Sequence, residues 1–323
     1  MLSEKKTICY SRRLIELGAF MSASITLIGS LNPEYLDKFN AWLEERGLQG
    51  PIRLLSDAQD AISVAQVMVD DNLLDRVSIR TELLRISNDT GIDHIYQSSM
   101  LDIKTPGVAV FDMDSTLIKA EVMDELAVEA GIGEQISAVT ASAMRGEIDF
   151  VESFVQRLAL LKGLSSEVMD GVYNRIQHMD GISTLMKVLH HYGWHTAILS
   201  GGFTYFADRV QAEYGMTEVH ANVLEIQNNE LTGKHLGDIV DGERKKLLLT
   251  NIVAAQNVDW QQTIACGDGA NDLLMLNHAA LGVALHAKPL VREQAPCPMN
   301  NLGLDGILYL LGMTSAQIRE LSA

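Results

Sequence analysis

The sequence predicts an α/β protein with two domains, and three observations lead to this prediction. The chain has 323 residues, more than a single hydrophobic core usually holds. After residue 180, apolar runs of strand length alternate with segments of helical periodicity, which is typical of a doubly wound parallel sheet. Residues 122–182 have helical spacing and no convincing strand, so we expect a helical insertion in a sheet domain of residues 105–323. A small α+β domain, residues 1–104, precedes it.

The first domain is expected to alternate as strand, helix, strand, strand, helix and strand. This βαββαβ order is that of a ferredoxin-like domain. Pro106 and Gly107 end a polar stretch that we interpret as the linker between the domains. The expected strands are 24–29, 51–55, 62–69 and 93–97, and the expected helices are 33–47 and 75–89.

The second domain opens with a buried strand, VAVF, at residues 108–111. In an open parallel sheet, ligands bind beyond the carboxyl ends of the strands, so the residues that follow each strand matter most. The later expected strands are 195–203 and 263–269, with a hairpin over 223–234. The expected helices are 123–131, 149–163 and 165–177 in the insertion, and 181–193, a helix from Tyr205, 243–256 and 270–279 in the sheet domain.

Composition excludes several classes of protein. Hydrophobic residues make up 47% and charged residues 21%, as in ordinary globular proteins. The net charge of −17 argues against general binding to nucleic acid or to an anionic membrane surface, and no apolar run is long enough for a transmembrane helix. The three cysteines, Cys9, Cys266 and Cys297, are too few and scattered for a disulfide framework or a zinc site, so we expect a cytoplasmic protein.

Polar clusters follow three of the expected strands. Asp112 and Asp114 come directly after VAVF, and their side chains point the same way because they are two residues apart on an extended chain. Each cluster alone is a weak signal, since such residues often form polar loops or solvated helix faces. At one edge of a parallel sheet, however, they would all converge. The other members are Ser200 and Gly201 after the apolar run TAIL (196–199), Asp268, Asn271 and Asp272 after TIAC (263–266), and Lys245 at the start of a helix.

Together these residues describe one chemical device. Converging carboxylates require a hard cation with oxygen ligands, and Mg²⁺ with a substrate phosphate fits best. The cation and Lys245 would cancel the repulsion, which leaves Asp112 free to attack an electrophile and Asp114 free to give a proton to the leaving group. The Ser200 hydroxyl and the backbone N–H groups around Gly201 would hold phosphate oxygens.

The second domain resembles the haloacid dehalogenase (HAD) superfamily, and within it the phosphoserine phosphatase branch. The motifs that carry the resemblance are FDMDST at 111–116, LSGGF at 199–203, Lys245 and GDGANDLLML at 267–276. The resemblance implies a HAD-like fold in which the insertion is a mobile cap, an aspartyl-phosphate intermediate on Asp112, and acid and base roles for Asp114. It also implies Mg²⁺ ligation by Asp112, the Asp114 main-chain carbonyl and Asp268. The resemblance further implies that four residues contact the phosphate or the nucleophile: Ser200, Gly201, Lys245 and Asn271. Asp272 would contact these residues and not the substrate.

Residues of the insertion indicate the substrate. O-phospho-L-serine carries an ammonium and a carboxylate besides its phosphate, and Glu121 with Arg157 would complement them. The resemblance assigns them those contacts, and it implies that Met144 and Phe150 form an apolar lid. In the simpler interpretation, Arg157 is an exposed helical arginine and Glu121 only favours the start of the adjacent helix.

Alternatives remain open at this point. The same residues could transfer the phosphoryl group to an acceptor alcohol such as homoserine, or hydrolyse another small phosphate monoester. A Mg²⁺-dependent phospho-accepting signalling module also groups aspartates with a lysine, although such modules lack a helical insertion of this size. The first domain resembles small amino-acid-binding (ACT-like) regulatory domains, which would suit feedback by serine. Formation of a homodimer, or no functional role, also stay open for it.

Overall fold

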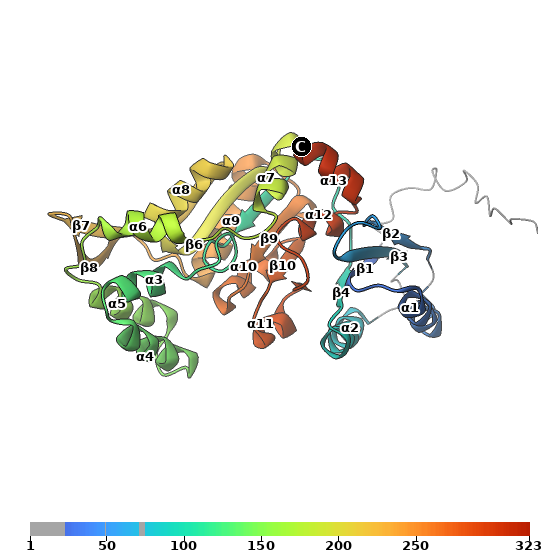
Figure 1. Cartoon of the computed structure of the whole chain (residues 1–323), viewed down its shortest axis with the longest axis horizontal. Coiled ribbons are helices and arrows are strands. Elements are labelled where there is room, and N and C mark those ends of the chain that lie inside the picture. Colours follow the sequence, from blue (N-terminus) through green and yellow to red (C-terminus); the bar gives the residue numbers. More distant parts are fainter. Residues whose placement is uncertain (1–22, 49, 71–74) are drawn as a thin grey trace, which may run out of the picture.

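The computed structural model describes residues 23–48, 50–70 and 75–323, which form two α/β units side by side along the long axis of the molecule (Figure 1). Residues 1–22, and with them Cys9, lie outside the described residues. No helix in the described part of the chain has both the length and the apolar character needed to cross a bilayer. Cys266 and Cys297 are buried free thiols.

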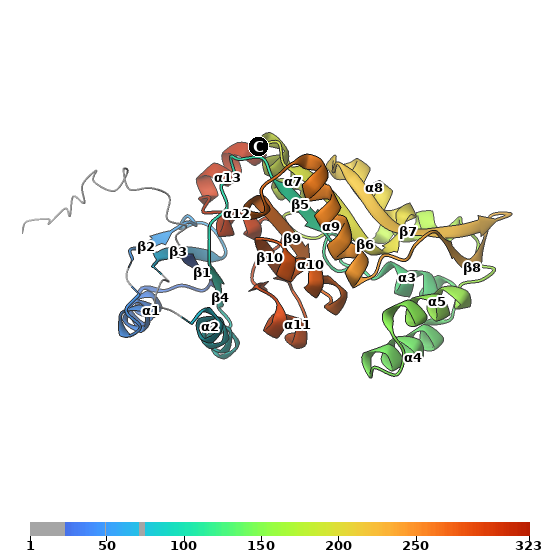
Figure 2. The ribbon, with the colours of Figure 1, turned by 180° about the vertical axis from the view of Figure 1, so that it is seen from behind.

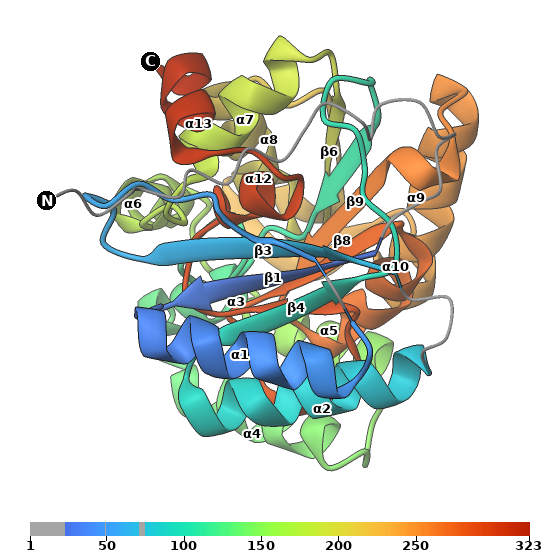
Figure 3. The same cartoon turned by 90° about the vertical axis from the view of Figure 1, so that its right-hand side faces the viewer.

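The N-terminal unit has the predicted ferredoxin-like topology. Its antiparallel sheet has the order β2-β3-β1-β4, and both helices cover the same face of it (Figure 3). The helices form here because each has an N-cap side chain, Asn32 or Asp75, and buries an apolar stripe that includes Phe39 and Leu83. The elements are β1 (Ala23–Gly29), α1 (Pro33–Glu45), β2 (Ile52–Leu54), β3 (Ser63–Val69), α2 (Arg76–Thr90) and β4 (Asp93–Gln97).

The C-terminal unit is a seven-stranded sheet of order β11-β10-β9-β5-β6-β7-β8. All neighbouring strands are parallel except the β7–β8 hairpin at one edge, so the predicted doubly wound parallel sheet is confirmed. Helices α7 and α8 pack on one face, and α9 and α10 on the other (Figures 1 and 2). The strands are β5 (Val108–Phe111), β6 (His195–Phe203), β7 (Glu218–Gln227), β8 (Glu230–Leu236), β9 (Thr263–Gly267), β10 (Leu281–Leu285) and β11 (Cys297–Met299), and these helices are α7 (Ile182–His191), α8 (Thr204–Tyr214), α9 (Gly242–Gln256) and α10 (Leu273–His278).

The helical insertion forms a cap beside the carboxyl ends of the strands. The chain enters it near Ile118 and leaves it near His178, and these two residues form an isolated β-bridge at its base. The cap also rests on the sheet domain, because α5 packs on β8 of the hairpin and the ring of Phe154 lies 6.1 Å from that of Phe203 at the end of β6. Its helices are α3 (Val122–Glu129), α4 (Gly133–Met144), α5 (Phe150–Leu160) and α6 (Val168–Arg175).

Some elements were not predicted from the sequence. Helix α4 was missed because it is rich in Ala, Ser and Thr and buries only Ile136, so it has no wide apolar stripe. Strand β7 begins at Glu218, five residues before the expected hairpin, and its first part pairs with β6. After residue 279 the structure adds β10, α11 (Pro289–Gln294), β11, α12 (Gly306–Leu310) and α13 (Ser315–Ser322).

The two units share one buried core. Ile28, Val64 and Ile95, on the sheet face opposite the N-terminal helices, belong to the same apolar cluster as Leu308 of α12 and Met313. Polar contacts add to this interface, because the buried Asp93 carboxylate accepts hydrogen bonds from the backbone N–H groups of residues 300 and 301, each at 2.8 Å. The N-terminal unit is therefore fixed against the end of the C-terminal sheet that carries β11.

Candidate active site

The strand-end residues predicted from the sequence converge at one edge of the C-terminal sheet. Asp112 follows β5, and its Oδ1 lies 2.8 Å from the Nζ of Lys245, which reaches the site from the first turn of α9. The same ammonium lies 2.7 Å from Oδ1 of Asp272, which follows β9. Lys245 and Asp272 are fully buried and Asp112 is 5% exposed. Lys245 lies in the run ERKK (243–246), whose composition favours a solvent-exposed helix face. Its ammonium is nevertheless buried, because two carboxylates offset the cost of removing its charge from water.

Three carboxylates form a candidate metal site. One oxygen each from Asp112, Asp268 and Asp272 lies within 4.8 Å of the others. The Thr116 hydroxyl lies 3.3 Å from the Asp268 carboxylate. Such a set of hard oxygen donors fits Mg²⁺, which uses few protein carboxylates and completes its shell with water and substrate phosphate. The Asp114 carboxylate is not part of this trio. The ligand that the sequence predicts from Asp114 is its main-chain carbonyl, which is a different atom.

Burial and mutual repulsion raise the pKa values of these acids. Burial, followed by the charge of Asp272, raises the pKa of Asp112 well above its usual range despite the opposing effect of Lys245. Burial and the nearby Glu121 do the same to the pKa of Asp114. Burial and Asp272 raise the pKa of Asp268 to about 7. The single positive charge of Lys245 therefore does not balance the negative charges at this edge of the sheet. A bound divalent cation would balance them.

Glycines let residues 200–203, the irregular end of β6 that we call the Ser200 loop, approach the carboxylates. The Ser200 side chain is buried, and its hydroxyl accepts a hydrogen bond of 2.9 Å from the N–H of Gly202. A Cβ at Gly202 would lie 2.5 Å from Oδ2 of Asp114, and one at Gly201 would lie 3.2 Å from the ring of Phe150. A side chain at Gly202 would therefore displace the Asp114 carboxylate, and one at Gly201 would crowd the ring of Phe150.

Asn222 on β7 holds this loop in place and was missed by the sequence prediction. Its side chain is 1% exposed. Nδ2 donates to the carbonyl of Gly201 at 2.8 Å, and Oδ1 accepts from the N–H of Val240 at 2.9 Å. It thus ties the Ser200 loop to the segment that leads into α9 and Lys245. No local motif surrounds Asn222, and the strand that carries it was expected to begin only at residue 223.

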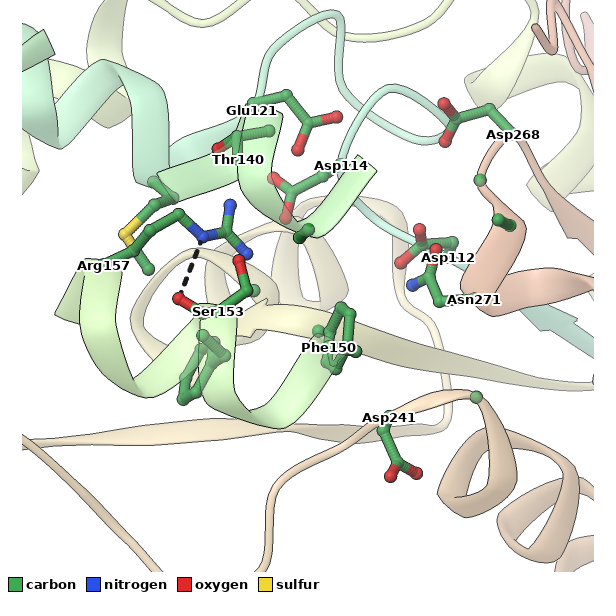
Figure 4. A pocket seen from close by; sticks show the side chains of 18 of the residues that line it. Asp112, Asp114, Glu121, Thr140, Phe150, Ser153, Arg157, Asp241, Asp268 and Asn271 are labelled. Atoms are coloured by element: carbon green, nitrogen blue, oxygen red, sulfur yellow. Dashed lines mark hydrogen bonds between the residues drawn. The ribbon is translucent and has the colours of Figure 1, made fainter. Parts of the chain in front are cut away.

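The cap residues face the same cavity, which has a volume of about 700 Å³. Figure 4 shows the Arg157 guanidinium and the Glu121 carboxylate near Asp114. Glu121 accepts a hydrogen bond from the Ser115 hydroxyl at 2.7 Å. Phe150 is half-buried in the wall, whereas Met144 is 72% exposed at the rim.

Arg157 is half-buried and does not match the interpretation as an exposed surface residue. Its Nε lies 3.4 Å from the carbonyl of Ser153. Burial lowers the pKa of Arg157, while Asp124, Glu121 and Asp114 act in the opposite direction. A guanidinium facing these acids in a cavity is available for a further carboxylate.

The cap and the core are joined directly through Asp114. Its Oδ1 accepts a hydrogen bond of 3.0 Å from the N–H of Val122, the first residue of α3. The start of the cap therefore fixes the orientation of this acid.

Other cavity residues were also missed. Asp241 is the N-cap of α9, a signal that the sequence contained, and Lys288 follows β10, a strand that was not predicted. Three more residues line the cavity from the cap: Asp124, Thr140 and Ser153. No local pattern in the sequence indicates this, because it is the packing of α3, α4 and α5 against each other that brings them to the cavity.

The fold and the site define a hydrolase in which a helical cap covers aspartates at the ends of parallel strands. The family of haloacid dehalogenase-like hydrolases matches residues 109–277, and the chain belongs to this family. A phosphoserine phosphatase of Archaeoglobus fulgidus is 39% identical over 76% of this chain and 72% of its own length. One from Haemophilus influenzae is 41% identical over 72% of this chain and 74% of its own. The crystal structure of a probable phosphoserine phosphatase from Vibrio cholerae superposes with a TM-score of 0.73 at 32% identity, covering 92% of this chain and 88% of that one.

Proposed function

We propose that the chain is a Mg²⁺-dependent phosphatase that hydrolyses O-phospho-L-serine to L-serine and phosphate. The observation that supports it most is the shared cavity, which has Asp112 and Asp114 on the core side and Glu121 and Arg157 on the cap side. This cavity offers a nucleophile and an acid for a phosphate ester, together with an anion and a cation for the two other charges of phosphoserine. The phosphoserine phosphatases at about 40% identity point to the same reaction.

The reaction has two steps in this proposal. A carboxylate oxygen of Asp112 attacks phosphorus and forms an aspartyl phosphate, while the bond from phosphorus to the serine oxygen breaks and that oxygen takes the proton of Asp114. The Asp114 carboxylate then takes a proton from water, and the resulting hydroxide attacks phosphorus, breaks the bond to Asp112 and releases phosphate. The raised pKa of Asp114 suits this sequence because it favours the protonated acid at the start.

The surrounding residues hold the charges in place. Lys245 keeps Asp112 oriented and offsets its charge, and Asp272 fixes the ammonium from the other side. Ser200, the N–H groups around Gly201, and Asn271 would bind phosphate oxygens. Of the three clustered carboxylates, Asp272 already has both oxygens engaged, by Lys245 at 2.7 Å and by the N–H of Gly269 at 2.9 Å. Asp112, Asp268 and the Asp114 carbonyl would therefore hold Mg²⁺, and the ion would neutralise charge on the phosphate oxygens.

Specificity would come from the cap. Arg157 would bind the substrate carboxylate with its planar fork, and Glu121 would bind the ammonium. Phe150 in the wall and Met144 at the rim would exclude water over the substrate.

A phosphate-release screen tests this function. Purified protein is incubated with Mg²⁺ and phosphoserine, phosphothreonine or common sugar phosphates, with EDTA as the metal-free control. We expect phosphoserine to have the highest kcat/KM and EDTA to abolish turnover reversibly. A higher kcat/KM for a sugar phosphate would contradict the substrate, and formation of phosphohomoserine when homoserine is added would support phosphotransfer. A stable phosphoprotein without turnover would support a signalling module.

Two further predictions concern the cell and the assembly. We infer a cytoplasmic protein, and the two buried free thiols, Cys266 and Cys297, support a reducing environment. The predicted homodimer stays a prediction, which sedimentation of the full-length chain would test.

A further inference from the structure

A second cavity lies between the two units, away from the carboxylates. Its volume is about 530 Å³. One face of α2 forms one wall, and residues 292–296 with Pro298 form the facing wall, next to β4. Figure 2 shows α2 and α11 on either side of this region. The catalytic role described above uses none of its lining residues.

The lining is basic although the chain is acidic. Three arginines line it, Arg80 and Arg85 from α2 and Arg292 from α11, against a single acid, Glu293. His94, which also lines it, adds no charge near neutral pH because burial lowers its pKa to about 4. In a chain with a net charge of −17, this is a local excess of positive charge in a concave site.

Two of the arginines are held across the interface. Arg80 of the N-terminal unit donates to the carbonyl of Ala295 at 2.6 Å, and Arg292 of the C-terminal unit donates to Oδ1 of Asn88 at 2.7 Å. Both are half-buried, and within the described residues neither has a carboxylate within salt-bridge distance. Arg85 differs, since it is mostly exposed and pairs with Asp89.

We propose that this cavity binds a small oxyanion, a phosphate or a carboxylate, between Arg80 and Arg292. Each guanidinium has five N–H donors, and the hydrogen bonds above occupy one on each. The planar fork matches both carboxylate and phosphate oxygens, and partial burial strengthens the interaction. The bound anion would replace the missing carboxylate partner of both arginines and join the two units.

The site lies one short helix away from the catalytic cavity. Lys288, the N-cap of α11, lines the catalytic cavity, and Arg292 lies on the same helix four residues later. An anion that holds Arg292 against α2 therefore restrains α11, whose N-cap is Lys288.

Hydrogen–deuterium exchange of the full-length protein tests this site separately from the catalytic one. Inorganic phosphate and malonate are the probes, added in parallel. We expect at least one of them to slow exchange severalfold in peptides from residues 76–90 and 289–298. Protection by phosphate alone assigns the site to phosphates, protection by malonate alone to carboxylates, and protection by both to oxyanions in general.

Variants show whether the arginines carry this effect. Arg80→Gln combined with Arg292→Gln should abolish the protection at 76–90 and 289–298 but keep any phosphate protection at 199–203. Arg53→Gln, which removes one positive charge from the exposed strand β2, is the matched control and should behave as wild type. If the double variant is unstable, Arg292→Gln alone should weaken the effect and Arg292→Lys should restore part of it. Absence of protection with both probes up to 20 mM, or protection that survives in the double variant, would overturn the proposal.

Discussion

The side chain of Asn222 donates a hydrogen bond of 2.8 Å to the main-chain carbonyl of Gly201. Asn222 lies on β7 and Gly201 at the end of β6, so the bond joins neighbouring strands where the Ser200 loop begins. Because the other end of the same amide accepts from Val240, one buried side chain sets the spacing between this loop and α9. Asn222 is thus a positioning residue for groups that we propose to bind phosphate.

Asn222→Asp should lower kcat/KM for phosphoserine about tenfold to hundredfold. The carboxylate keeps the acceptor for Val240 but places a negative oxygen against the Gly201 carbonyl, and such a defect in a buried pair costs about 1–3 kcal/mol. The inhibition constant of inorganic phosphate should rise in parallel, which simple loss of stability would not produce. Asn251→Asp, on the exposed side of α9, is the control with the same change in charge. An unchanged phosphate affinity in Asn222→Asp would contradict the positioning role.

Asp114→Asn should impair hydrolysis of phosphoserine more than that of para-nitrophenyl phosphate. The serine alkoxide is a poor leaving group that needs a proton, whereas the phenolate leaves without one. The measurement is the ratio of single-turnover rates of aspartyl-phosphate formation on the two substrates, because both share the later hydrolysis step. Equal losses on both substrates would show that Asp114 does not act as the acid.

Arg157→Ala should separate phosphoserine from a generic phosphate ester. Loss of the guanidinium should lower kcat/KM for phosphoserine. The fall should correspond to a loss of about 2–4 kcal/mol in transition-state binding, as is usual when one partner of a desolvated charge pair is removed. Para-nitrophenyl phosphate has no carboxylate, so its hydrolysis should change little.

Two controls accompany the Arg157 experiment. Arg157→Lys should recover only part of the loss, since an ammonium cannot reproduce the planar fork. Thermal stability of each variant reports damage to the cap. If both substrates lose activity in the same proportion, Arg157 acts through the structure of the cap and not through specificity.

His94 should make the protein less stable in mild acid. It is buried in the N-terminal unit, with its Nε2 at 2.6 Å from the Tyr35 hydroxyl, and burial lowers its pKa to about 4. An unfolded histidine titrates near 6.5, so between these values the unfolded state takes up a proton that the folded state does not. The contribution of neutral His94 to the free energy of unfolding is therefore fully present above about pH 6.5. It is lost as the pH falls towards 4, and the total loss is about 3 kcal/mol.

The measurement is the urea midpoint of wild type and His94→Gln between pH 4.5 and 7.5. The difference between them should change steadily in favour of the variant as the pH falls. His191→Gln, at an exposed position on α7, is the control and should follow wild type. Parallel curves for wild type and His94→Gln would contradict this account of the acid sensitivity.

The meeting of Asp112, Ser200 and Asp268 at one sheet edge could be predicted from the sequence. Asp112 and Asp268 directly follow β5 and β9, and Ser200 lies near the end of β6. Strands that alternate with helices are parallel, so their carboxyl ends must lie together. The ferredoxin-like unit was equally predictable, because the spacing of its apolar residues switches between that of a helix and that of a strand at clear turn residues. Gly91 is an example, since it ends α2 in the left-handed conformation.

The fold class and the chemistry of the strand ends follow from the amino-acid sequence alone, because they depend on local periodicity and on residues next to each other in the chain. Contacts between distant segments follow only from the packing of the whole chain. Lys245 became a buried ion-pair partner only because β5 and β9 bring Asp112 and Asp272 to the first turn of α9. Asn222, the orientation of Arg157 and the basic cavity around Arg80 and Arg292 depend in the same way on packing between segments that are far apart in sequence. Local patterns contain no signal for such contacts, since burial and pairing across elements are properties of the packed chain.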